Sequence, residues 1–209
     1  MKQIKIVFQG DSITDAGRDR RQYHHMGSGY PKFASEYLKA NHPDVDFTFY
    51  NFGISGNRTC QVFDRLWQDG LEFQPDIISL LIGINDIWHR YGGDRVATTD
   101  EQIALNYRCI LERIRKESNA KIVMIAPYLL DFEGKQYMRE DLNRILPIIR
   151  ALAEEYADVY IPLDEEFDKA VPTKEPLYYS GDGVHPNENG AEFIGRLYAE
   201  ALRPLIEQL

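Results

Sequence analysis

The chain has 209 residues, of which 44% are hydrophobic and 27% are charged. This length and composition suit a single folded α/β domain spanning residues 1–209, and they exclude a disordered chain. The formal net charge is −9, from 33 acidic and 24 basic residues. Because a nucleic-acid backbone is bound by clustered Lys and Arg side chains, we expect no nucleic-acid partner.

The N-terminus leads directly from Met1 into a strand-like run. It lacks the apolar stretch and the small-residue cleavage site of a signal peptide. No apolar run approaches the roughly 20 residues that a membrane-spanning helix needs. We therefore expect a cytoplasmic protein that has no membrane partner.

Short β-rich runs alternate with longer helical patterns along the chain. The expected strands are residues 4–8, 45–51, 77–82, 121–126 and 159–162. The third run is apolar except for Ser79, as expected of a central parallel strand that is covered on both faces. The expected helices are residues 30–40, 60–70, 102–117, 141–156 and 188–202, with a kink or break at Pro147 and a disturbed pattern at Pro204.

This alternation predicts a three-layer α/β/α sandwich, with a five-stranded parallel sheet covered by helices on both faces in a flavodoxin-like arrangement. In such sheets the functional site lies outside the carboxyl ends of the strands, near a switch in strand order. Three polar or glycine-rich segments follow expected strands directly, and a fourth lies between the fifth strand and the last helix. Their position is the first indication of function.

Two of these segments carry candidate catalytic side chains. Ser12 lies in a turn after the first strand, where its hydroxyl can be exposed above the sheet. Asp182 and His185 lie three residues apart, so the carboxylate can accept the Nδ1 proton and leave Nε2 free to act as a base. Taken alone, each segment is also compatible with an ordinary turn or helix cap.

The other two segments carry candidate hydrogen-bond donors. The glycines of residues 51–57 can present backbone N–H groups to an anion, although a flexible loop is the alternative. The amide of Asn85 follows the most apolar strand, where an Asx-turn is the alternative. Together the four segments supply a nucleophile, a base, an orienting carboxylate and oxyanion donors, which favours a hydrolase.

The four segments resemble the four blocks of the SGNH, or GDSL, hydrolases, and they extend from residue 10 to residue 186. The matching stretches are Gly10-Asp11-Ser12, Ser55-Gly56-Asn57, Gly83-Ile84-Asn85-Asp86 and Asp182-Gly183-Val184-His185. The resemblance implies the SGNH hydrolase fold and a serine esterase that needs no metal or organic cofactor. It implies a catalytic triad of Ser12, His185 and Asp182, and an oxyanion hole formed by Ser12, Gly56 and Asn85.

Three stretches are similar to a narrower group, the bacterial cytoplasmic acetylxylan esterases: residues 53–57, 83–88 and 126–128. This similarity implies a small-molecule ester substrate, namely an acetylated xylo-oligosaccharide that is deacetylated through an acyl-enzyme. We expect Trp88 to stack on a sugar face, with anchoring of its own loop as the alternative. We expect Asp15 to pair with Arg58 or to cap the first helix, without a catalytic role.

Two other functions stay open. A short-chain lipase, lysophospholipase or thioesterase would use the same triad, but it needs an apolar groove for the acyl chain. A flavodoxin-like binding module would give no reason for Ser12, Asn85 and His185 to converge. A homo-oligomer is possible, and the sequence does not decide it.

Overall fold

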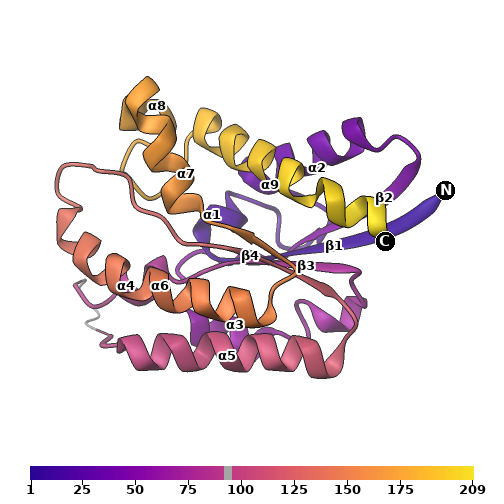
Figure 1. Cartoon of the computed structure of the whole chain (residues 1–209), viewed down its shortest axis with the longest axis horizontal. Helices are drawn as coiled ribbons and strands as arrows, with labels where there is room; N and C mark the ends of the chain where they lie inside the picture. Colours follow the sequence, from indigo (N-terminus) through magenta and orange to yellow (C-terminus); the bar gives the residue numbers. More distant parts are fainter. Residues whose placement is uncertain (92–95) are drawn as a thin grey trace.

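The structure is a computed structural model, and it describes residues 1–91 and 96–209. At its centre lies a five-stranded parallel sheet with the strand order β2-β1-β3-β4-β5 (Figure 1). The strands are β1 (Lys2–Gly10), β2 (Val45–Asn51), β3 (Ile77–Leu81), β4 (Lys121–Ile125) and β5 (Val159–Ile161). The five predicted strands and their parallel pairing are confirmed.

The central strand β3 is buried along its whole length, which explains its apolar sequence. Its single polar side chain, Ser79, lies 2.7 Å from the hydroxyl of the fully buried Tyr198. The two hydroxyl groups therefore satisfy each other inside the core, where an unpaired polar group would be costly.

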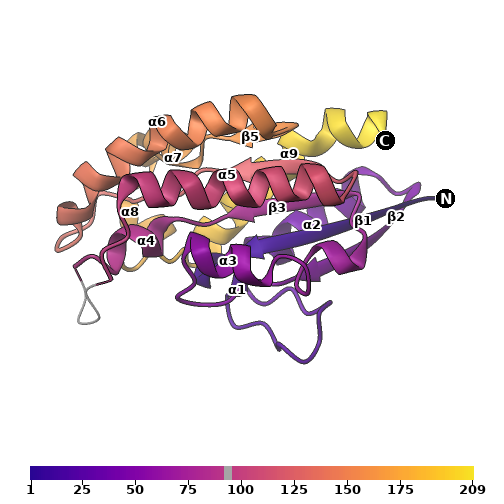
Figure 2. The same cartoon turned by 90° about the horizontal axis from the view of Figure 1, so that it is seen from below.

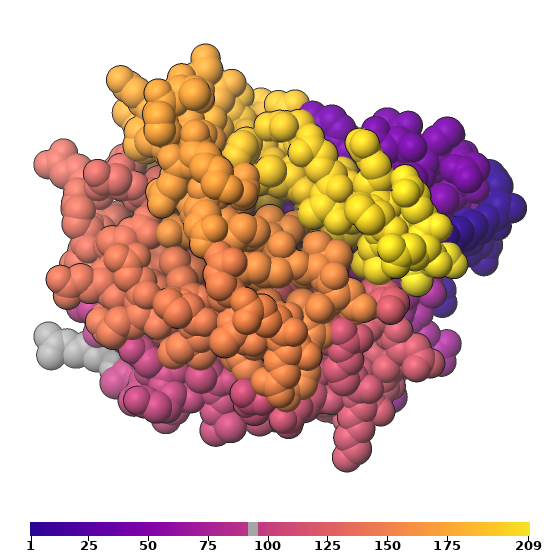
Figure 3. Space-filling view, in the orientation of Figure 1, coloured from indigo at the N-terminus to yellow at the C-terminus, as the bar shows by residue number. Residues whose placement is uncertain are grey.

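Helices cover both faces of the sheet, so the predicted α/β/α sandwich is confirmed (Figures 1 and 2). One layer contains α2 (Tyr30–Asn41) and α9 (Glu188–Gln208), and the other contains α3 (Thr59–Arg65), α5 (Asp100–Glu117) and α6 (Arg139–Tyr156). On the face of the molecule drawn in Figure 3, α9 (yellow) lies between α2 (purple) and the orange residues of α6 and α7 (Leu163–Ala170). No helix within the described ranges is long and apolar enough to cross a lipid bilayer.

The chain also contains shorter elements. They are α1 (Ser12–Asp15), α4 (Ile84–Trp88), α8 (Pro176–Tyr179) and the 3-10 helices η1 (Leu71–Phe73), η2 (Gln136–Met138) and η3 (Val171–Thr173). The helix expected at 60–70 is shorter than predicted, because α3 ends at Arg65 and turns follow it.

The two helical prolines do not interrupt their helices. A break at Pro147 is wrong, because α6 continues through it, and α9 continues past Pro204 to Gln208. Both prolines are exposed, so water can satisfy the carbonyl groups that lose an N–H partner. The buried side chains of Leu205 and Ile206 hold the last turn of α9 against the core.

The strand order places the switch point between β1 and β3. Strand β1 pairs with β2 on one side and with β3 on the other. The connection after β1 therefore leads to one side of this strand, and the connection after β2 crosses back to the other side. Ser12 follows the carboxyl end of β1, and Asn85 follows the carboxyl end of β3. Both termini lie at the opposite end of the molecule from α4 and α8 (Figures 1 and 2). The two predicted segments therefore follow the two strands that flank the switch point, where the functional site of such a sheet is expected.

Candidate active site

The first segment turns from β1 directly into the short helix α1. The carboxylate of Asp11 accepts a hydrogen bond from the backbone N–H of Ile13 at 3.0 Å, which caps this helix. Ser12 is half-buried, and its Oγ lies 2.9 Å from Nε2 of His185. The hydroxyl is thus within hydrogen-bond reach of an imidazole that comes from the far end of the chain.

The last segment forms a turn that is fixed by its own side chains. Asp182 accepts hydrogen bonds from the backbone N–H groups of Val184 and His185 at 2.9 and 2.7 Å. Its other oxygen lies 2.8 Å from Nδ1 of His185. Ser180 also holds the turn, because its hydroxyl donates to the carbonyl of His185 at 2.7 Å. Helices α7 and α8 separate this turn from β5 in the chain, so His185 does not extend directly from a strand of the sheet.

The pKa shifts of Asp182 and His185 favour transfer of a proton from Ser12 to the imidazole. Partial burial acts to raise the pKa of Asp182, but the hydrogen bonds from His185 and from the backbone outweigh it and hold the pKa well below the ordinary value. The hydrogen bond to Asp182 raises the pKa of His185 above 6.5. An ionised Asp182 keeps the proton of the neutral ring on Nδ1, so Nε2 can accept the proton of Ser12.

The second and third segments are joined to each other beside the switch point. Gly56 has a φ of 81° in a turn that the N–H of Asn57 closes onto the carbonyl of Ile54 at 3.1 Å. The amide of Asn85 donates to the carbonyl of Asn57 at 3.0 Å. Because an amide nitrogen carries two hydrogens, one N–H of Asn85 remains to bind an oxyanion.

A neighbouring contact reinforces this junction. Asp86 accepts hydrogen bonds from the backbone N–H and the hydroxyl of Thr59 at 2.9 and 2.7 Å. Since Thr59 begins α3 and Asp86 lies in α4, the two loops that carry Gly56 and Asn85 are held at a fixed separation. A preorganised pair of donors is what an oxyanion hole requires.

Arg65 is a residue of this site that the sequence did not indicate. Its guanidinium donates to the carbonyl of Gly10 at 3.0 Å, to the carbonyl of Phe52 at 2.7 Å and to the side chain of Asn57 at 2.8 Å. It also pairs with Asp69 at 3.1 Å. Arg65 therefore ties the segment of Ser12 to the segment of Gly56. Two of its acceptors are backbone carbonyl groups, which residue identity does not indicate.

The expectation for Asp15 is wrong. Its carboxylate pairs with Arg20 and accepts hydrogen bonds from Ser55, whereas Arg58 donates to Thr98. The helix cap is supplied by Asp11 instead. Asp15 thus connects the first segment to the second.

Trp88, which we expected to stack on a sugar or to anchor its own loop, lies beside the imidazole of His185. Its ring centroid is 5.8 Å from that of His185, and the two planes are inclined by 46°. The ammonium group of Lys135 lies 3.7 Å from the centre of the Trp88 ring and covers one of its faces. Trp88 therefore contacts the loop of Lys135, and its half-buried side chain also packs against the hydrophobic core.

The chain is similar over most of its length to two acetylxylan esterases. An acetylxylan esterase from Geobacillus stearothermophilus is 28% identical over 202 residues, which cover 93% of this chain and 91% of that enzyme. A second acetylxylan esterase, from Xylanibacter ruminicola, is 24% identical over 96% of this chain and 43% of its own length.

Two solved structures are also similar to this chain over nearly its whole length. A protein from Parabacteroides merdae described as a GDSL-like lipase superposes with a TM-score of 0.91 at 34% identity, covering 96% of this chain and 95% of its own. The acetylxylan esterase of Geobacillus stearothermophilus superposes with a TM-score of 0.87 at 25% identity, over 96% and 94% of the two chains. The model of the GDSL-like lipase/acylhydrolase family matches residues 8–193, which is most of the chain. The protein is therefore a serine esterase that belongs to the GDSL-like lipase/acylhydrolase family.

Proposed function

We propose that this esterase removes acetyl groups from acetylated xylo-oligosaccharides, with Ser12 as nucleophile, His185 as base and Asp182 as the orienting carboxylate. One observation carries the assignment: Ser12, His185 and Asp182 form a continuous chain of contacts of 2.9 and 2.8 Å. Such a chain is the arrangement that activates a serine hydroxyl.

In the first half of the reaction, Nε2 of His185 takes the proton of Ser12 as Oγ attacks the ester carbonyl. The carbonyl oxygen gains negative charge, which the N–H groups of Ser12, Gly56 and Asn85 stabilise. Removing one such donor typically raises the barrier by about 3–4 kcal/mol. The C–O bond of the ester then breaks, and the imidazolium gives its proton to the departing sugar hydroxyl.

In the second half, water hydrolyses the acetyl-Ser12 ester. His185 takes a proton from the water as its oxygen attacks the acyl carbon, and the same donors bind the second oxyanion. The bond to Oγ then breaks, acetate leaves, and His185 returns the proton to Ser12. Asp182 stays ionised throughout and stabilises the imidazolium in both halves.

The substrate class is supported by the relatives, by the position of Trp88 and by the net charge. The curated relatives are named acetylxylan esterases. Catalytic mutants of the Geobacillus enzyme replace a serine, an aspartate and a histidine, which are the residue types that meet here. The half-buried ring of Trp88 lies next to His185, where the leaving sugar would depart. The net charge of −9 also disfavours polyanionic substrates.

The test is a hydrolysis panel with acetyl, butyryl and octanoyl esters of one alcohol, followed by acetylated xylo-oligosaccharides. We expect the acetyl esters to have the highest kcat/KM. A preference for the octanoyl ester would favour the lipase or thioesterase function instead. Ser12→Ala is expected to abolish turnover and labelling by a fluorophosphonate, whereas Ser118→Ala, at the end of α5, serves as the matched serine control. A folded Ser12→Ala protein with substantial turnover would overturn the assignment of the nucleophile.

A further inference from the structure

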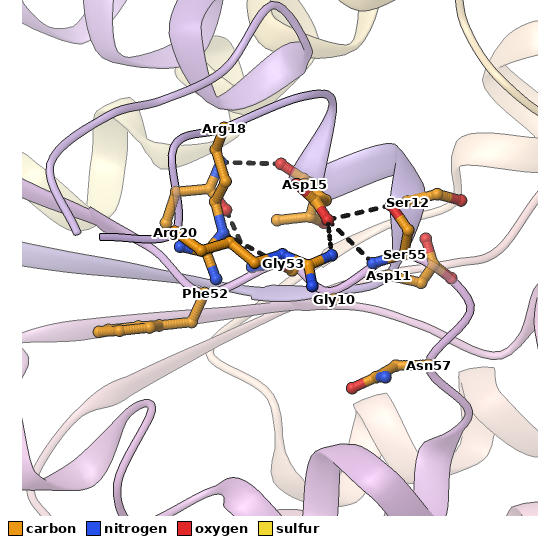
Figure 4. Close-up of polar contacts among 12 residues, drawn as sticks. Gly10, Asp11, Ser12, Asp15, Arg18, Arg20, Phe52, Gly53, Ser55 and Asn57 are labelled. Carbon is orange, nitrogen blue, oxygen red and sulfur yellow. Dashed lines mark hydrogen bonds and ion pairs between the residues drawn. The ribbon is translucent and has the colours of Figure 1, made fainter. Parts of the chain in front are cut away.

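The carboxylate of Asp15 joins the helix of Ser12 to the loop of Gly56. Its side chain is only 5% exposed. One of its oxygens accepts hydrogen bonds from the backbone N–H and from the hydroxyl of Ser55, both at 3.0 Å, and pairs with the guanidinium of Arg20. Figure 4 shows this carboxylate between Arg20 and Ser55. One oxygen of Asp15 therefore joins Arg20 to Ser55.

The backbones of the two segments are also packed directly together. A Cβ atom on Gly53 would lie 2.2 Å from the backbone nitrogen of Asp15, so only glycine fits there. The buried Arg18 donates to the carbonyl of Gly53 at 2.8 Å, and the amide of Asn51 donates to the carbonyl of Thr14 at 2.8 Å. The segment before Ser55 thus has little freedom to move relative to α1.

The position of Ser55 determines the direction of the Gly56 N–H. Ser55 and Gly56 are the two central residues of the turn from Ile54 to Asn57, and the N–H of Gly56 belongs to the peptide unit between them. Asp15 holds Ser55 at both its nitrogen and its hydroxyl, so it fixes one end of that peptide unit. Oxyanion donors act over 2.7–3.1 Å, and a displacement of about 1 Å can lower a rate about 100-fold.

The charge of Asp15 strengthens this attachment. Burial acts to raise its pKa, but the hydrogen bonds from Arg20 and Ser55 outweigh burial and lower the pKa below the ordinary value. The carboxylate is therefore ionised at neutral pH, and hydrogen bonds to an ionised acceptor are shorter and stronger than neutral ones.

We propose that Asp15, paired with Arg20, is a positioning residue of the oxyanion hole that directs the N–H of Gly56 at the developing negative charge by fixing Ser55. The inference depends on the role of Gly56 in the proposed function. Loss of Asp15 should weaken binding of the transition state much more than binding of the substrate, because the misdirected donor acts mainly on charge that develops during attack.

The test measures kcat and KM for 4-nitrophenyl acetate with the full-length chain. We expect Asp15→Ala to lower kcat about 10- to 100-fold while KM stays within about twofold. Asp15→Asn keeps an oxygen that can accept from Ser55, so it should recover part of the loss. Ser55→Ala removes only the hydroxyl contact and should lower kcat less than Asp15→Ala. Asp19→Ala, which removes a half-buried carboxylate of the same loop that pairs with Arg21 and not with Ser55, is the matched control with unchanged kcat.

A second measurement separates positioning from general damage to the fold. The inhibition constant of a phenylboronic acid, which forms a tetrahedral adduct with the nucleophile, should rise by the factor by which kcat/KM falls. If Asp15→Ala does not fold, Asp15→Asn and Ser55→Ala carry the test, and unchanged kcat in both overturns the inference.

Two further variants distinguish failure of the inference from failure of the proposed function. If Asn85→Ala lowers kcat but a folded Asp15→Ala does not, the inference is wrong and the proposed oxyanion hole stands. If Ser12→Ala and Asn85→Ala both retain wild-type kcat, the proposed function itself is wrong, and the inference falls with it.

Discussion

Asp182 contacts His185 twice, through its ring and through its backbone. One carboxylate oxygen lies 2.8 Å from Nδ1, and the other accepts the backbone N–H of the same residue at 2.7 Å. The carboxylate therefore fixes both the position of the imidazole and the nitrogen that carries its proton. The same contact raises the pKa of His185, because it stabilises the protonated ring.

This contact predicts the pH dependence of the esterase. The base must be neutral, and a His185 pKa above 6.5 means that activity is lost as pH falls through that raised value. Asp11, whose pKa burial raises to about 7, ionises in the same range, and its negative charge also favours protonated His185. We expect kcat/KM to rise through an apparent pKa above 6.5 and to stay high at mildly alkaline pH. A maximum at strongly acid pH would contradict this mechanism.

Asp182→Asn should separate the two effects of the carboxylate. Removing its charge lowers the pKa of His185, so the acidic limb of the profile should move to lower pH. The plateau of kcat should fall by about 10⁴, because an amide at this position favours the wrong tautomer. Full pH profiles of the wild-type protein and of Asp182→Asn test the shift of the acidic limb and the fall of the plateau. Asp168→Asn, on the exposed side of α7, is the control. A lower plateau with an unmoved limb would show that Asp182 does not set the pKa of His185.

Asn85→Ala tests the side-chain donor of the oxyanion hole. The substitution removes the free N–H and also the hydrogen bond to Asn57. We expect kcat to fall by about 10²–10³ with little change in KM, since the donor acts mainly on the transition state. Asn143→Ala, exposed on α6, is the matched control. An unchanged kcat with a much larger KM would make Asn85 a residue that binds the ground state.

The sequence was sufficient for the candidate catalytic residues. Ser12 and Asn85 follow the carboxyl ends of β1 and β3, which the parallel sheet brings to one edge. The block of His185 lies beyond α7 and α8, so its residue pattern indicated it rather than a strand end. The strand order and the residue patterns together therefore predicted the fold and the candidate site.

The sequence was not sufficient for the residues that hold those blocks in place. Arg65 binds carbonyl groups of Gly10 and Phe52, and Asp15 binds the backbone of Ser55. Backbone acceptors and donors leave no trace in residue identity, so these contacts cannot be found from composition or spacing. The end of α9 was missed for a different reason: the burial of Leu205, which the sequence did not indicate, outweighs the helix-breaking tendency of Pro204.

Arg65→Ala should lower both stability and activity. The side chain is 14% exposed, and its loss removes a donor from the carbonyl of Phe52, whereas the carbonyl of Gly10 keeps the N–H of Ile54. At about 1–3 kcal/mol for a buried group left unpaired, we expect the free energy of unfolding to fall by about 2 kcal/mol. Arg65→Lys should not restore it, because an ammonium cannot reproduce the planar fork of donors.

Urea unfolding of the two variants measures this loss. Arg113→Ala is the control, because its ion pair with Glu117 on the surface of α5 is expected to contribute only about 0.3–0.5 kcal/mol. If Arg65→Lys were as stable as the wild-type protein, a positive charge at this position would suffice, and the bridging role would be wrong.

The last prediction concerns the sugar that leaves the site. The ring of Trp88 lies next to His185, which protonates the leaving hydroxyl in the proposed mechanism, while Lys135 covers one face of the ring. A sugar ring that packs on the exposed part of this half-buried side chain gains apolar contact that a small aryl ester makes less fully. We therefore expect Trp88→Ala to lower kcat/KM about tenfold more for an acetylated xylo-oligosaccharide than for 4-nitrophenyl acetate, which corresponds to about 1.4 kcal/mol. Trp67→Ala removes a tryptophan that is 44% exposed and lies at the end of α3, so it is the matched control and should leave both values unchanged. An equal fall for the two esters would mean that Trp88 serves only to anchor the loop of Lys135, and the carbohydrate substrate would lose its main structural support.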